Sequence, residues 1–443
     1  MLKRMRSFLV LVMLFITVTM SAQVTTATMS GKVTAQDEPI IGATIVAVHE
    51  PSGTRYGTVT NVSGQFNLQG MRTGGLYKVE ISYVGYQTAI YKGINLLLGE
   101  NYVLNVSLKE SSELLDEVVV TASKESNMKS DRAGAIMNAN RDMINSTPTI
   151  SRSISDIMRL SPQGADVGNG FAVGGGNYRQ SFVTVDGAAF NNTFGLGGNL
   201  PANGSPISLD ALEQVTVAVT PFDVRQSGFT GGAINAVTRS GDNQFRGTVY
   251  GYFNNENLRG DRVEDYKLTR SKSQYYTYGA SFGGPIIKDK LFFFVNGEYE
   301  DNVTAGSSYQ PRTSLDQEYT GNVRRPVENT IVDGNETWVG LNDMRQYLKE
   351  KYNYDPGRYN NYSVNTPAYR IMARLDWNAN LNNKLSLRFT KTHTKDSNFP
   401  SSSTSPLSAD DIYPGDTGLG IPKGKDSGRS TKYSMSFENS NYY

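Results

Sequence analysis

The side chains that could do chemistry in this 443-residue sequence are few and scattered. No cysteine is present, which excludes disulfides, thiolate metal sites and a cysteine nucleophile. The two histidines, His49 and His393, lie far apart, and each is predicted to be an ordinary surface or strand residue. Glu298 and Glu300 could form a catalytic carboxylate pair, but no base, nucleophile or metal cluster accompanies them. We therefore expect solvated residues on a polar strand face, no enzymatic activity and no cofactor.

The glycine-rich stretch GNGFAVGGGN, residues 168–177, is a candidate phosphate loop by composition only. It lacks the G-x-x-x-x-G-K-[ST] pattern and the Rossmann spacing, and no βαβ pattern surrounds it. Nucleotide binding is therefore excluded. The net charge of +1 also gives no general attraction to nucleic acid, so no nucleic-acid partner is expected.

The N-terminal segment 1–22 is predicted to be a secretory signal. The basic MLKRMR precedes the apolar FLVLVMLFITVTM, and SAQ then offers small residues for cleavage after Ala22. A membrane anchor is the alternative, but the apolar run is short for a span. No second apolar run of spanning length follows, so we expect no helical membrane crossing in the mature chain. If this chain enters a membrane, it must do so as a β-barrel.

Residues 23–110 are predicted to form a small β-sandwich. Short alternating segments are separated by turn glycines, as in the stretch PIIGATIVAVH. There Ala43, Ile45 and Ala47 are predicted to share one strand face, opposite the side chains of Thr44, Val46 and Val48.

A linker over residues 111–125 carries an acidic and then valine-rich stretch, DEVVVTA. Its surroundings are polar, so the segment is expected to be exposed. An exposed apolar run invites edge pairing, and lending the strand to another protein's sheet would cover it. The predicted partner-binding residues are Asp116, Glu117, Val118, Val119, Val120, Thr121 and Ala122.

Residues 126–240 are predicted to form an α+β domain. FVTVDG indicates a strand that enters an Asp-Gly turn, and Ser208–Leu212 indicates a short helix with Ser208 as its N-cap. QVTVAVT and GGAINAVTRS indicate two further strands, the second with glycines that permit a tight entry. The structural motif residues predicted here are Val185, Asp186, Gly187, Gly231, Gly232, Ile234 and Asn235.

Residues 241–443 alternate between apolar and polar side chains over about six segments of membrane-crossing length. Short turns at one end and long polar loops at the other are typical of outer-membrane proteins, with the polar faces pointing into a lumen. Six strands cannot close around a domain of the size of residues 126–240, and an open sheet edge is not tolerated in lipid. We therefore expect the N-terminal part of a longer chain and an incomplete transmembrane β-barrel.

Taken together, these segments resemble the TonB-dependent outer-membrane receptors of the Oar-like branch. SGKV, PIIGATI, TNVSGQF and ISYVGYQT are similar to the carboxypeptidase-regulatory-like domain, a prealbumin-like sandwich also grouped with carbohydrate-binding-like folds. DEVVVTA resembles the TonB box, and the VDG turn followed by GGAINAVT resembles the plug domain. AVGGG stands where the family has I-R-G, and VTPFDVRQ replaces R-G-P, so the plug subfamily stays open.

The resemblance implies a receptor in the cell outer membrane with its N-terminal domain in the periplasm. Its implied partners are a TonB-type inner-membrane energy transducer, outer-membrane lipid and an unidentified extracellular ligand: a siderophore, oligosaccharide, peptide or protein. No H-E-x-x-H or comparable zinc cluster is present, so no peptidase activity follows.

A non-transporting surface adhesin or scaffold remains the alternative function. The sandwich would then bind glycans. Glycan binding by residues 23–110, without a growth defect on loss of the gene, would favour that alternative.

Overall fold

The computed structural model describes most of the chain after the predicted signal sequence. The described residues are 25–110, 118–121, 136–149, 152–167, 170–191, 200, 205–219, 231–258, 260, 262–264, 266–267, 272–305, 310–311, 323–324, 330–332, 336–338, 341–355, 363–381, 383–398 and 437–442. The predicted signal, residues 1–22, lies outside them. In this described part, no helix has the length and apolarity to cross a membrane.

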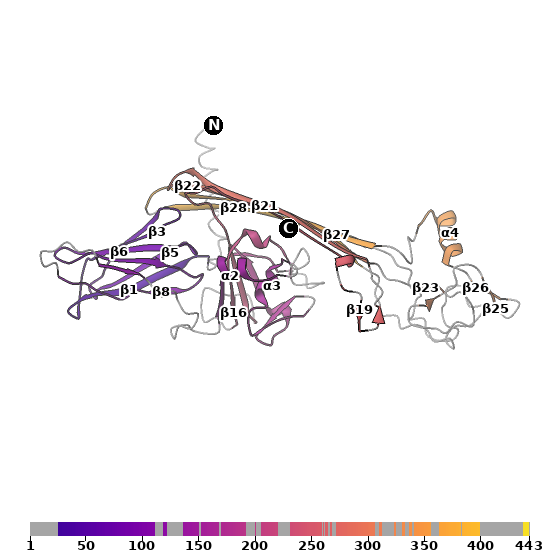
Figure 1. Cartoon of the computed structure of the whole chain (residues 1–443), viewed down its shortest axis with the longest axis horizontal. Helices are drawn as coiled ribbons and strands as arrows, with labels where there is room; N and C mark the ends of the chain where they lie inside the picture. The colour runs from indigo at the N-terminus through magenta and orange to yellow at the C-terminus, as the bar shows by residue number, and fades with distance from the viewer. Residues whose placement is uncertain are drawn as a thin grey trace, which may run out of the picture. The chain divides into compact units, whose positions relative to one another are not determined.

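Two five-stranded sheets form the N-terminal sandwich, drawn in indigo and purple in Figure 1. The first sheet has the order β2-β1-β5, and β8 and β9 both pair with β1 in parallel. The second has the order β10-β7-β6-β3-β4. The strands are β1 (Ala27–Ala35), β2 (Glu38–Pro39), β3 (Thr44–His49), β4 (Thr54–Val59), β5 (Gln65–Met71), β6 (Tyr77–Ser82), β7 (Ala89–Ile94), β8 (Asn101–Val103), β9 (Val106–Ser107) and β10 (Val118–Thr121).

The sandwich core forms because side chains alternate between the two faces of each strand. Ala43, Ile45 and Ala47 are fully buried, which confirms the predicted inward face. Val79 and Ile81 on β6 pair in register with Ala47 and Ile45 and are equally buried. All buried members of this core cluster lie between Ala27 and Leu108, so the sandwich has a hydrophobic core of its own.

Residues 136–240 form a second, mixed sheet with short helices, and we refer to them as the plug region after the domain that they resemble. The sheet order is β11-β16-β17-β14-β15. Only the β14·β17 pair is parallel. The elements are β11 (Ile136–Asn140), α2 (Arg141–Ser146), α3 (Ile154–Met158), β12 (Gly164–Asp166), β13 (Phe171–Val173), η1 (Tyr178–Gln180), β14 (Phe182–Val185), β15 (Ala188–Ala189), η3 (Leu209–Ala211), β16 (Leu212–Ala218) and β17 (Ala233–Thr238).

Local sequence determines the turns and caps of the plug region. Val185 pairs with Ala188, so Asp186 and Gly187 form a two-residue hairpin turn with φ values of 51° and 84°. Asp-Gly suits such a turn because both positions need positive φ. Ser208 caps η3 by accepting a hydrogen bond from the Asp210 amide at 3.3 Å, as predicted, although the helix is 3-10 rather than α.

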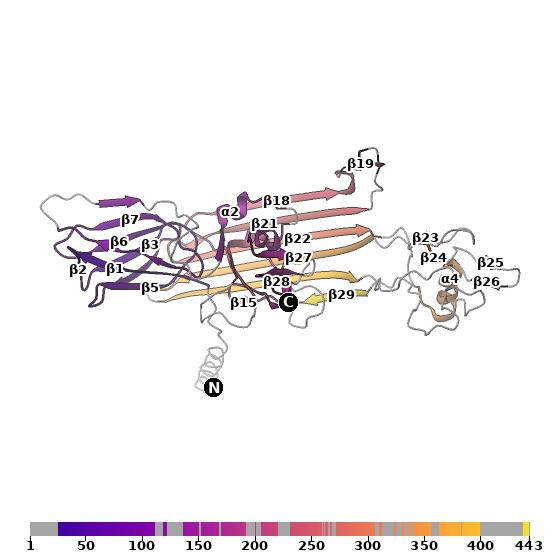
Figure 2. The same ribbon diagram turned by 90° about the horizontal axis from the view of Figure 1, so that it is seen from below.

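Six strands, which we call the long strands, form the third sheet, in the sequential order β18-β21-β22-β27-β28-β29 (Figure 2). Five of them have 10 to 16 residues, and β29 has six. They are β18 (Arg246–Asn255), β21 (Ser273–Ile287), β22 (Leu291–Ala305), β27 (Ser363–Asn378), β28 (Lys384–Asn398) and β29 (Phe437–Tyr442). The remaining elements are η4 (Glu256–Leu258), β19 (Arg262–Val263), β20 (Tyr266–Lys267), β23 (Gln310–Pro311), β24 (Val323–Arg324), β25 (Thr330–Val332), β26 (Glu336–Trp338) and α4 (Leu341–Tyr352).

By its contacts the chain divides into two compact units. The first comprises residues 1–250, 279–298 and 370–392, so the sandwich, the plug region and the adjoining parts of β21, β22, β27 and β28 belong to one unit. The second comprises residues 251–278, 299–369 and 393–443.

The long strands reverse the burial pattern of a water-soluble sheet. On β22, Asn296 and Glu298 are 3% and 6% exposed, whereas Val295 is 43% exposed. On β27, Arg374 is buried and Leu375 is 40% exposed. Apolar residues on the outside and polar residues on the inside suit a sheet that contacts lipid. The predicted fold class is therefore confirmed: mainly β, with a sandwich, an α+β plug region and strands of the outer-membrane type.

His49 gives the sandwich a predicted dependence on acid. Burial, together with the charge of nearby Arg72, lowers the pKa of His49 to about 3, although its ring nitrogens form hydrogen bonds with Ser52 Oγ at 2.6 Å and Gly74 O at 3.2 Å. Below its ordinary pKa of about 6.5, the unfolded chain binds a proton that the native sandwich excludes. Stability is therefore unaffected above that pH and falls by about 1.4 kcal/mol per pH unit as the pH drops toward 3.

Urea denaturation of residues 23–110 between pH 4 and 7, followed by circular dichroism, measures this slope. The His49→Gln variant is the control, because it retains a polar side chain but cannot titrate. Equal slopes for the wild type and the variant would contradict the assignment.

Candidate functional site

A buried ion pair joins the plug region to the inner face of the long strands. Arg370 Nη1 on β27 lies 2.9 Å from Glu298 Oε1 on β22. The second carboxylate oxygen accepts hydrogen bonds from the hydroxyls of Ser208, at 2.9 Å, and Tyr250, at 2.6 Å. Ser208 is the N-cap of η3, so one carboxylate connects the plug region with three strands.

The surroundings of this pair compensate for removing two charges from water. Only 2% of the Arg370 side chain and 3% of the Glu298 side chain are exposed. Arg370 Nε donates a hydrogen bond to the Ser205 carbonyl, and Thr392 Oγ1 donates one to the Pro206 carbonyl. Residues 205–208 of the plug region are therefore held from β22, β27 and β28.

The expectation of solvated acids on β22 is wrong. Glu298 and Glu300 lie on one strand face, as predicted, but they are only 6% and 7% exposed. The alternation of apolar and polar residues along the strand correctly predicted the face on which the two glutamates lie. It could not reveal that residues from the plug region cover the carboxylate of Glu298.

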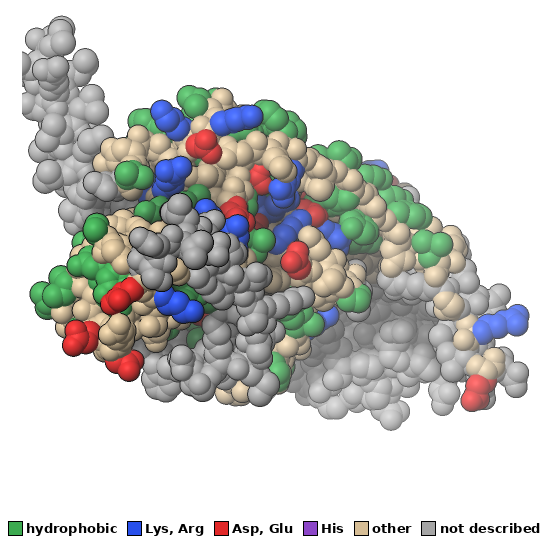
Figure 3. Space-filling view, turned by 60° about the vertical axis from the view of Figure 1, so that its left-hand side comes forward, with side chains coloured by type: hydrophobic (Ala, Val, Ile, Leu, Met, Phe, Trp, Pro, Cys, Tyr) green, Lys and Arg blue, Asp and Glu red, His purple; other side chains and the backbone are tan. Residues whose placement is uncertain are grey.

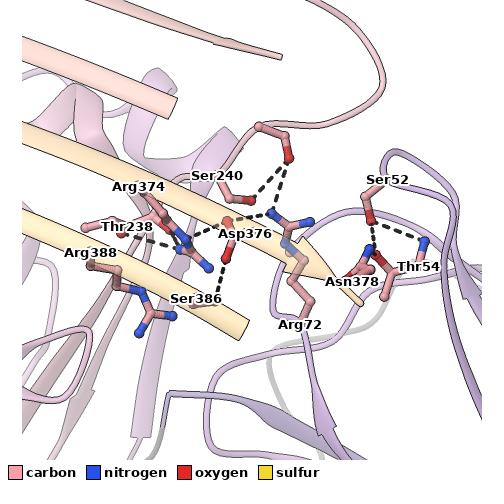
Figure 4. Close-up of polar contacts among 12 residues, drawn as sticks. Ser52, Thr54, Arg72, Thr238, Ser240, Arg374, Asp376, Asn378, Ser386 and Arg388 are labelled. Atoms are coloured by element: carbon pink, nitrogen blue, oxygen red, sulfur yellow. Dashed lines mark hydrogen bonds and ion pairs between the residues drawn. The ribbon is translucent and has the colours of Figure 1, made fainter. Parts of the chain in front are cut away.

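A second cluster surrounds Asp376 near the inner end of β27, as Figure 4 shows. Its carboxylate contacts Arg374 Nε at 2.8 Å and Arg72 Nη2 at 3.4 Å, and it accepts a hydrogen bond from Ser386 Oγ at 2.5 Å. Arg72 follows strand β5 of the sandwich and also donates to the Gly241 carbonyl at 3.2 Å. The sandwich thus reaches the same strand residues as the plug region.

The predicted Asp-Gly turn is tied to these strands through Thr238. Asp186 accepts hydrogen bonds from both the amide and the hydroxyl of Thr238, the first at 3.0 Å. Arg388 Nε on β28 lies 3.5 Å from the Asp186 carboxylate, and Arg374 Nη1 donates to the Thr238 carbonyl at 2.6 Å. The end of β17 is therefore held by Arg374 of β27 (Figure 4), and the turn that binds Thr238 is held by Arg388 of β28.

The remaining motif residues lie in the plug sheet itself. Val185 and Ile234 are buried core residues on the paired strands β14 and β17. Asn235 Oδ1 accepts a hydrogen bond from Thr184 Oγ1 at 2.7 Å. A Cβ at Gly232 would lie 2.4 Å from Val173 Cγ1, so close packing requires glycine there, and Gly231 lies against the backbone of Gln180.

A cavity of about 500 Å³ lies among these contacts, between the sandwich, the end of β17 and the inner parts of β27 and β28. The charged residues that line it are Arg72, Arg141, Arg239, Arg246, Arg374, Lys384 and Arg388, together with Glu213, Asp242 and Asp376. On the face shown in Figure 3, Lys and Arg side chains lie beside Asp and Glu side chains rather than alone.

The pKa values of two plug-region side chains in the cavity are shifted. Burial raises the pKa of the Glu213 carboxyl, although nearby Arg239 and Arg141 oppose this shift. Burial and repulsion from Arg141 lower the pKa of Arg239. Within the described residues, no group of three or more His, Cys, Asp and Glu side chains could hold a metal ion. The arrangement holds chain segments together through ion pairs.

The predicted partner-binding segment is described only in part. Asp116, Glu117 and Ala122 lie outside the described residues, as do residues 111–117 and 122–135 in general. Val118–Thr121 form β10, which pairs in parallel with β7 of the sandwich. The middle of the segment is therefore an added strand of the second sandwich sheet.

Sequence reasoning missed the residues that make the contacts between these parts. Strand alternation alone puts Arg370, Arg374 and Asp376 on the polar face of β27 and identifies no partner for them. Their spacing of two or four residues was the available signal, because basic residues repeated on one face of a membrane strand need counter-charges. Nothing in the sequence indicated that Arg72, in a different domain of the chain, would supply the cation beside Asp376.

The ion pair between Arg370 and Glu298 gives a testable prediction. Arg370→Met leaves a buried carboxylate without its cation, and breaking such a pair typically costs about 3–5 kcal/mol. We expect faster trypsin cleavage within residues 136–240 in outer-membrane vesicles and a lower urea midpoint for that region. Arg246→Met is the matched control, since that arginine is 59% exposed at its side chain and its contact with Asp242 is 3.5 Å long.

The double variant Arg370→Met with Glu298→Met should recover most of the loss, because no buried charge then remains unpaired. Protease resistance of Arg370→Met equal to that of Arg246→Met would contradict the role given to the ion pair.

Comparisons with known proteins agree with this architecture. Residues 28–109 match the Carboxypeptidase regulatory-like domain, and residues 237–420 match the Outer membrane beta barrel domain. The chain is 25% identical over 300 residues to the TonB-dependent transporter Oar of Myxococcus xanthus, covering 65% of this chain and 26% of that protein. It is 29% identical over 221 residues to the TonB-dependent receptor SusC of Bacteroides thetaiotaomicron, covering 46% and 20%.

Among solved structures, the siderophore receptor PirA of Acinetobacter baumannii aligns with 67% of this chain and 35% of its own, at 17% identity and a TM-score of 0.37. The chain thus spans about a quarter of the length of the curated relatives that it matches. The two matched domains and these relatives place the chain in the outer membrane, and the chain is similar to TonB-dependent transporters and receptors over its matched residues.

Proposed function

We propose that this protein imports an extracellular ligand across the outer membrane, with energy delivered through a TonB box at Asp116–Ala122. The observation that carries the proposal is the set of contacts between the plug region and the long strands. Ser208 and Thr238 are held by Glu298, Arg374 and the other strand residues described above. A channel closed by a plug needs such contacts, because they hold the plug in the channel while other parts of it move.

The order of elements supports transmission of force from the box to the plug region. The first described element after the box is β11, and among the described strands it lies at the edge of the plug sheet, paired with β16. Traction on residues 116–122 reaches β11 first through the intervening chain. An edge strand can separate from its neighbour without breaking the β16·β17 and β14·β17 ladders.

The ion pairs lie downstream of β11 in the plug region. Residues 205–208 and Thr238 are bonded to strands that the membrane holds in place. Residues 205–208 and Thr238 therefore resist a force that is applied at β11. The chain between β11 and residue 205 bears that force. Partial unfolding that begins at β11 would open a path while the rest of the plug region stays attached.

The proposed partners follow from the same arrangement. The sandwich and the box face the periplasm, where a TonB-type inner-membrane transducer binds the box. Exposed apolar side chains of the long strands, such as Val249, Leu387 and Phe389, contact outer-membrane lipid. The ligand belongs to one of four classes: a siderophore, an oligosaccharide, a peptide or a protein. No catalytic step and no cofactor is part of this mechanism.

Replacing residues 116–122 with a Gly-Ser segment of equal length in the native protein tests the proposal. The spacing between sandwich and plug region is kept, but the side chains for the transducer are removed. We expect uptake of the ligand whose import depends on this gene to fall to the level of the gene deletion. Binding of the same ligand to the cell surface should remain at the wild-type level, because extracellular contacts are unchanged.

The control replaces residues 123–125 and 127–130 in the same way, so that an equal number of positions changes just after the box. Energised uptake that survives the 116–122 replacement would refute the mechanism. Loss of surface binding would instead indicate a folding or export defect.

A further inference from the structure

Positive charge is in excess in the cavity between the sandwich, the end of β17 and the inner parts of β27 and β28. Seven arginine and lysine side chains line this cavity, against three carboxylates. Outside the lining, Asp186 holds Arg388. Asp210 holds Arg141 but also binds Arg152. With these groups included, eight cations face five carboxylates, in a chain whose net charge is only +1.

Arg239 lines the cavity without an ion pair to a carboxylate of the described residues. Within the described part of the chain, its guanidinium donates one hydrogen bond, to the Asp210 carbonyl at 3.4 Å, and lies 4.9 Å from the centroid of the Phe294 ring. A guanidinium group carries five N–H donors. Burial and repulsion from Arg141 lower the pKa of Arg239, so the nearby acids do not fully offset these two effects. Most donors of Arg239 are therefore available to a bound molecule.

Arg388 on β28 is a second cation of the cavity with available donors. Its Nε is buried and forms no hydrogen bond to a described residue, and the nearest Asp186 oxygen is 3.5 Å away. Figure 4 shows Arg388 and Arg374 on the neighbouring strands β28 and β27. Like charges on neighbouring strands repel each other, and an anion placed between them would offset that repulsion.

Two arginines of the cavity share a single carboxylate. Arg72 of the sandwich and Arg374 of β27 both contact Asp376. Their side chains are only 16% and 6% exposed, so water compensates little for the charge that Asp376 leaves unbalanced. The sandwich, the plug region and two long strands thus each contribute to one group of side chains, which we call the arginine cluster: Arg72, Arg239, Arg374 and Arg388.

The size and the charge of the cavity define the kind of ligand that it fits. Ligand pockets commonly enclose about 300–1,000 Å³. This cavity encloses about 500 Å³. Guanidinium groups bind carboxylate and phosphate oxygens through paired N–H donors. An excess of more than one positive charge suits an anion that carries at least two negative charges, which is a phosphate compound or a polycarboxylate.

The acidic side chain of Glu213 is compatible with such a ligand, although it also lines the cavity. Burial raises the pKa of Glu213. This shift favours the protonated carboxyl group, which does not repel an anion.

The ligand comes from solution, because β27 separates the arginine cluster from lipid. Arg374 and Asp376 are buried on one face of β27, whereas Leu375 and Trp377 on the other face are 40% and 50% exposed. Exposed apolar side chains on that second face suit contact with lipid. A lipid headgroup would approach from the face opposite to the cavity.

We propose that the arginine cluster binds a small multivalent oxyanion from solution, and that this anion connects the sandwich, the plug region and the strands β27 and β28. The site requires neither transport nor an energy transducer, so it goes beyond the function proposed above. The anion accepts hydrogen bonds from Arg239 and Arg388 and adds the counter-charge that Asp376 cannot supply to two arginines. Because the cluster exists only in the folded chain, binding stabilises the native protein.

Calorimetric titration of the native protein in a neutral detergent, at constant ionic strength, tests the site with diphosphate, citrate and acetate. We expect diphosphate or citrate to bind at least tenfold more tightly than acetate, since acetate carries a single charge. Tighter binding of diphosphate would support a phosphate compound as the ligand, and tighter binding of citrate would support a polycarboxylate. Equal affinities for the three probes, or no binding, would overturn the proposal.

Arg239→Gln with Arg388→Gln should weaken binding of the preferred probe at least tenfold. Lys32→Gln with Lys92→Gln is the matched control, because it removes the same charge from two exposed sandwich residues outside the cavity lining. Its affinity should stay within twofold of the wild type. Equal weakening in the two variants would indicate general attraction to positive charge and would overturn the site.

Arg239→Lys with Arg388→Lys keeps the test decisive if the glutamine variant does not fold. The lysines retain both charges but replace each planar fork of donors by a single ammonium group. We expect at least threefold weaker binding and a smaller increase of the urea midpoint on addition of the preferred probe. Affinity equal to that of the wild type would contradict the role given to these two arginines.

Discussion

The structure depends on how charged side chains on the inner face of the long strands find partners. Glu298 and Arg370 are almost completely buried and are acceptable there only because they pair and because Ser205, Ser208 and Tyr250 satisfy their remaining groups. The opposite faces of the same strands expose valine, leucine and phenylalanine, which suits lipid. The plug region therefore helps to stabilise this buried pair, because Ser205 and Ser208 supply hydrogen-bond partners for its two charges.

These contacts are unevenly distributed along the plug region. The ion pairs and carbonyl contacts described here concentrate at residues 205–208, at the Asp186 turn and at Thr238, which all follow β11 in sequence. Among the strands that the structure describes, β11 lies at the edge of its sheet, beside β16. The plug region is therefore attached to the long strands through its later segments, whereas its first strand, β11, can separate from the sheet. This arrangement suits a domain that must partly unfold under force and stay in its channel.

The sandwich contacts two other segments of the chain, the strand β27 and the strand β10. Arg72 reaches Asp376, which also binds Arg374, so a sandwich residue shares a carboxylate with an arginine that holds Thr238. At its other edge, β7 accepts β10 in parallel. The sandwich therefore contacts β27 through Arg72 and carries β10 on its second sheet.

The sequence by itself determined the elements and their faces. Alternation identified Ala43, Ile45 and Ala47 as core, the Asp186-Gly187 pair required its hairpin turn, and Ser208 began a helix, because each depends on neighbours close by in the chain. Tertiary structure decided the partners. Glu298 was expected to be solvated and is buried, Arg72 of the sandwich meets Asp376 of β27, and Val118–Thr121 lie on β7. A strand pattern specifies which way a side chain points, but the charge or backbone that meets it comes from a distant segment, and only the folded chain brings the two together.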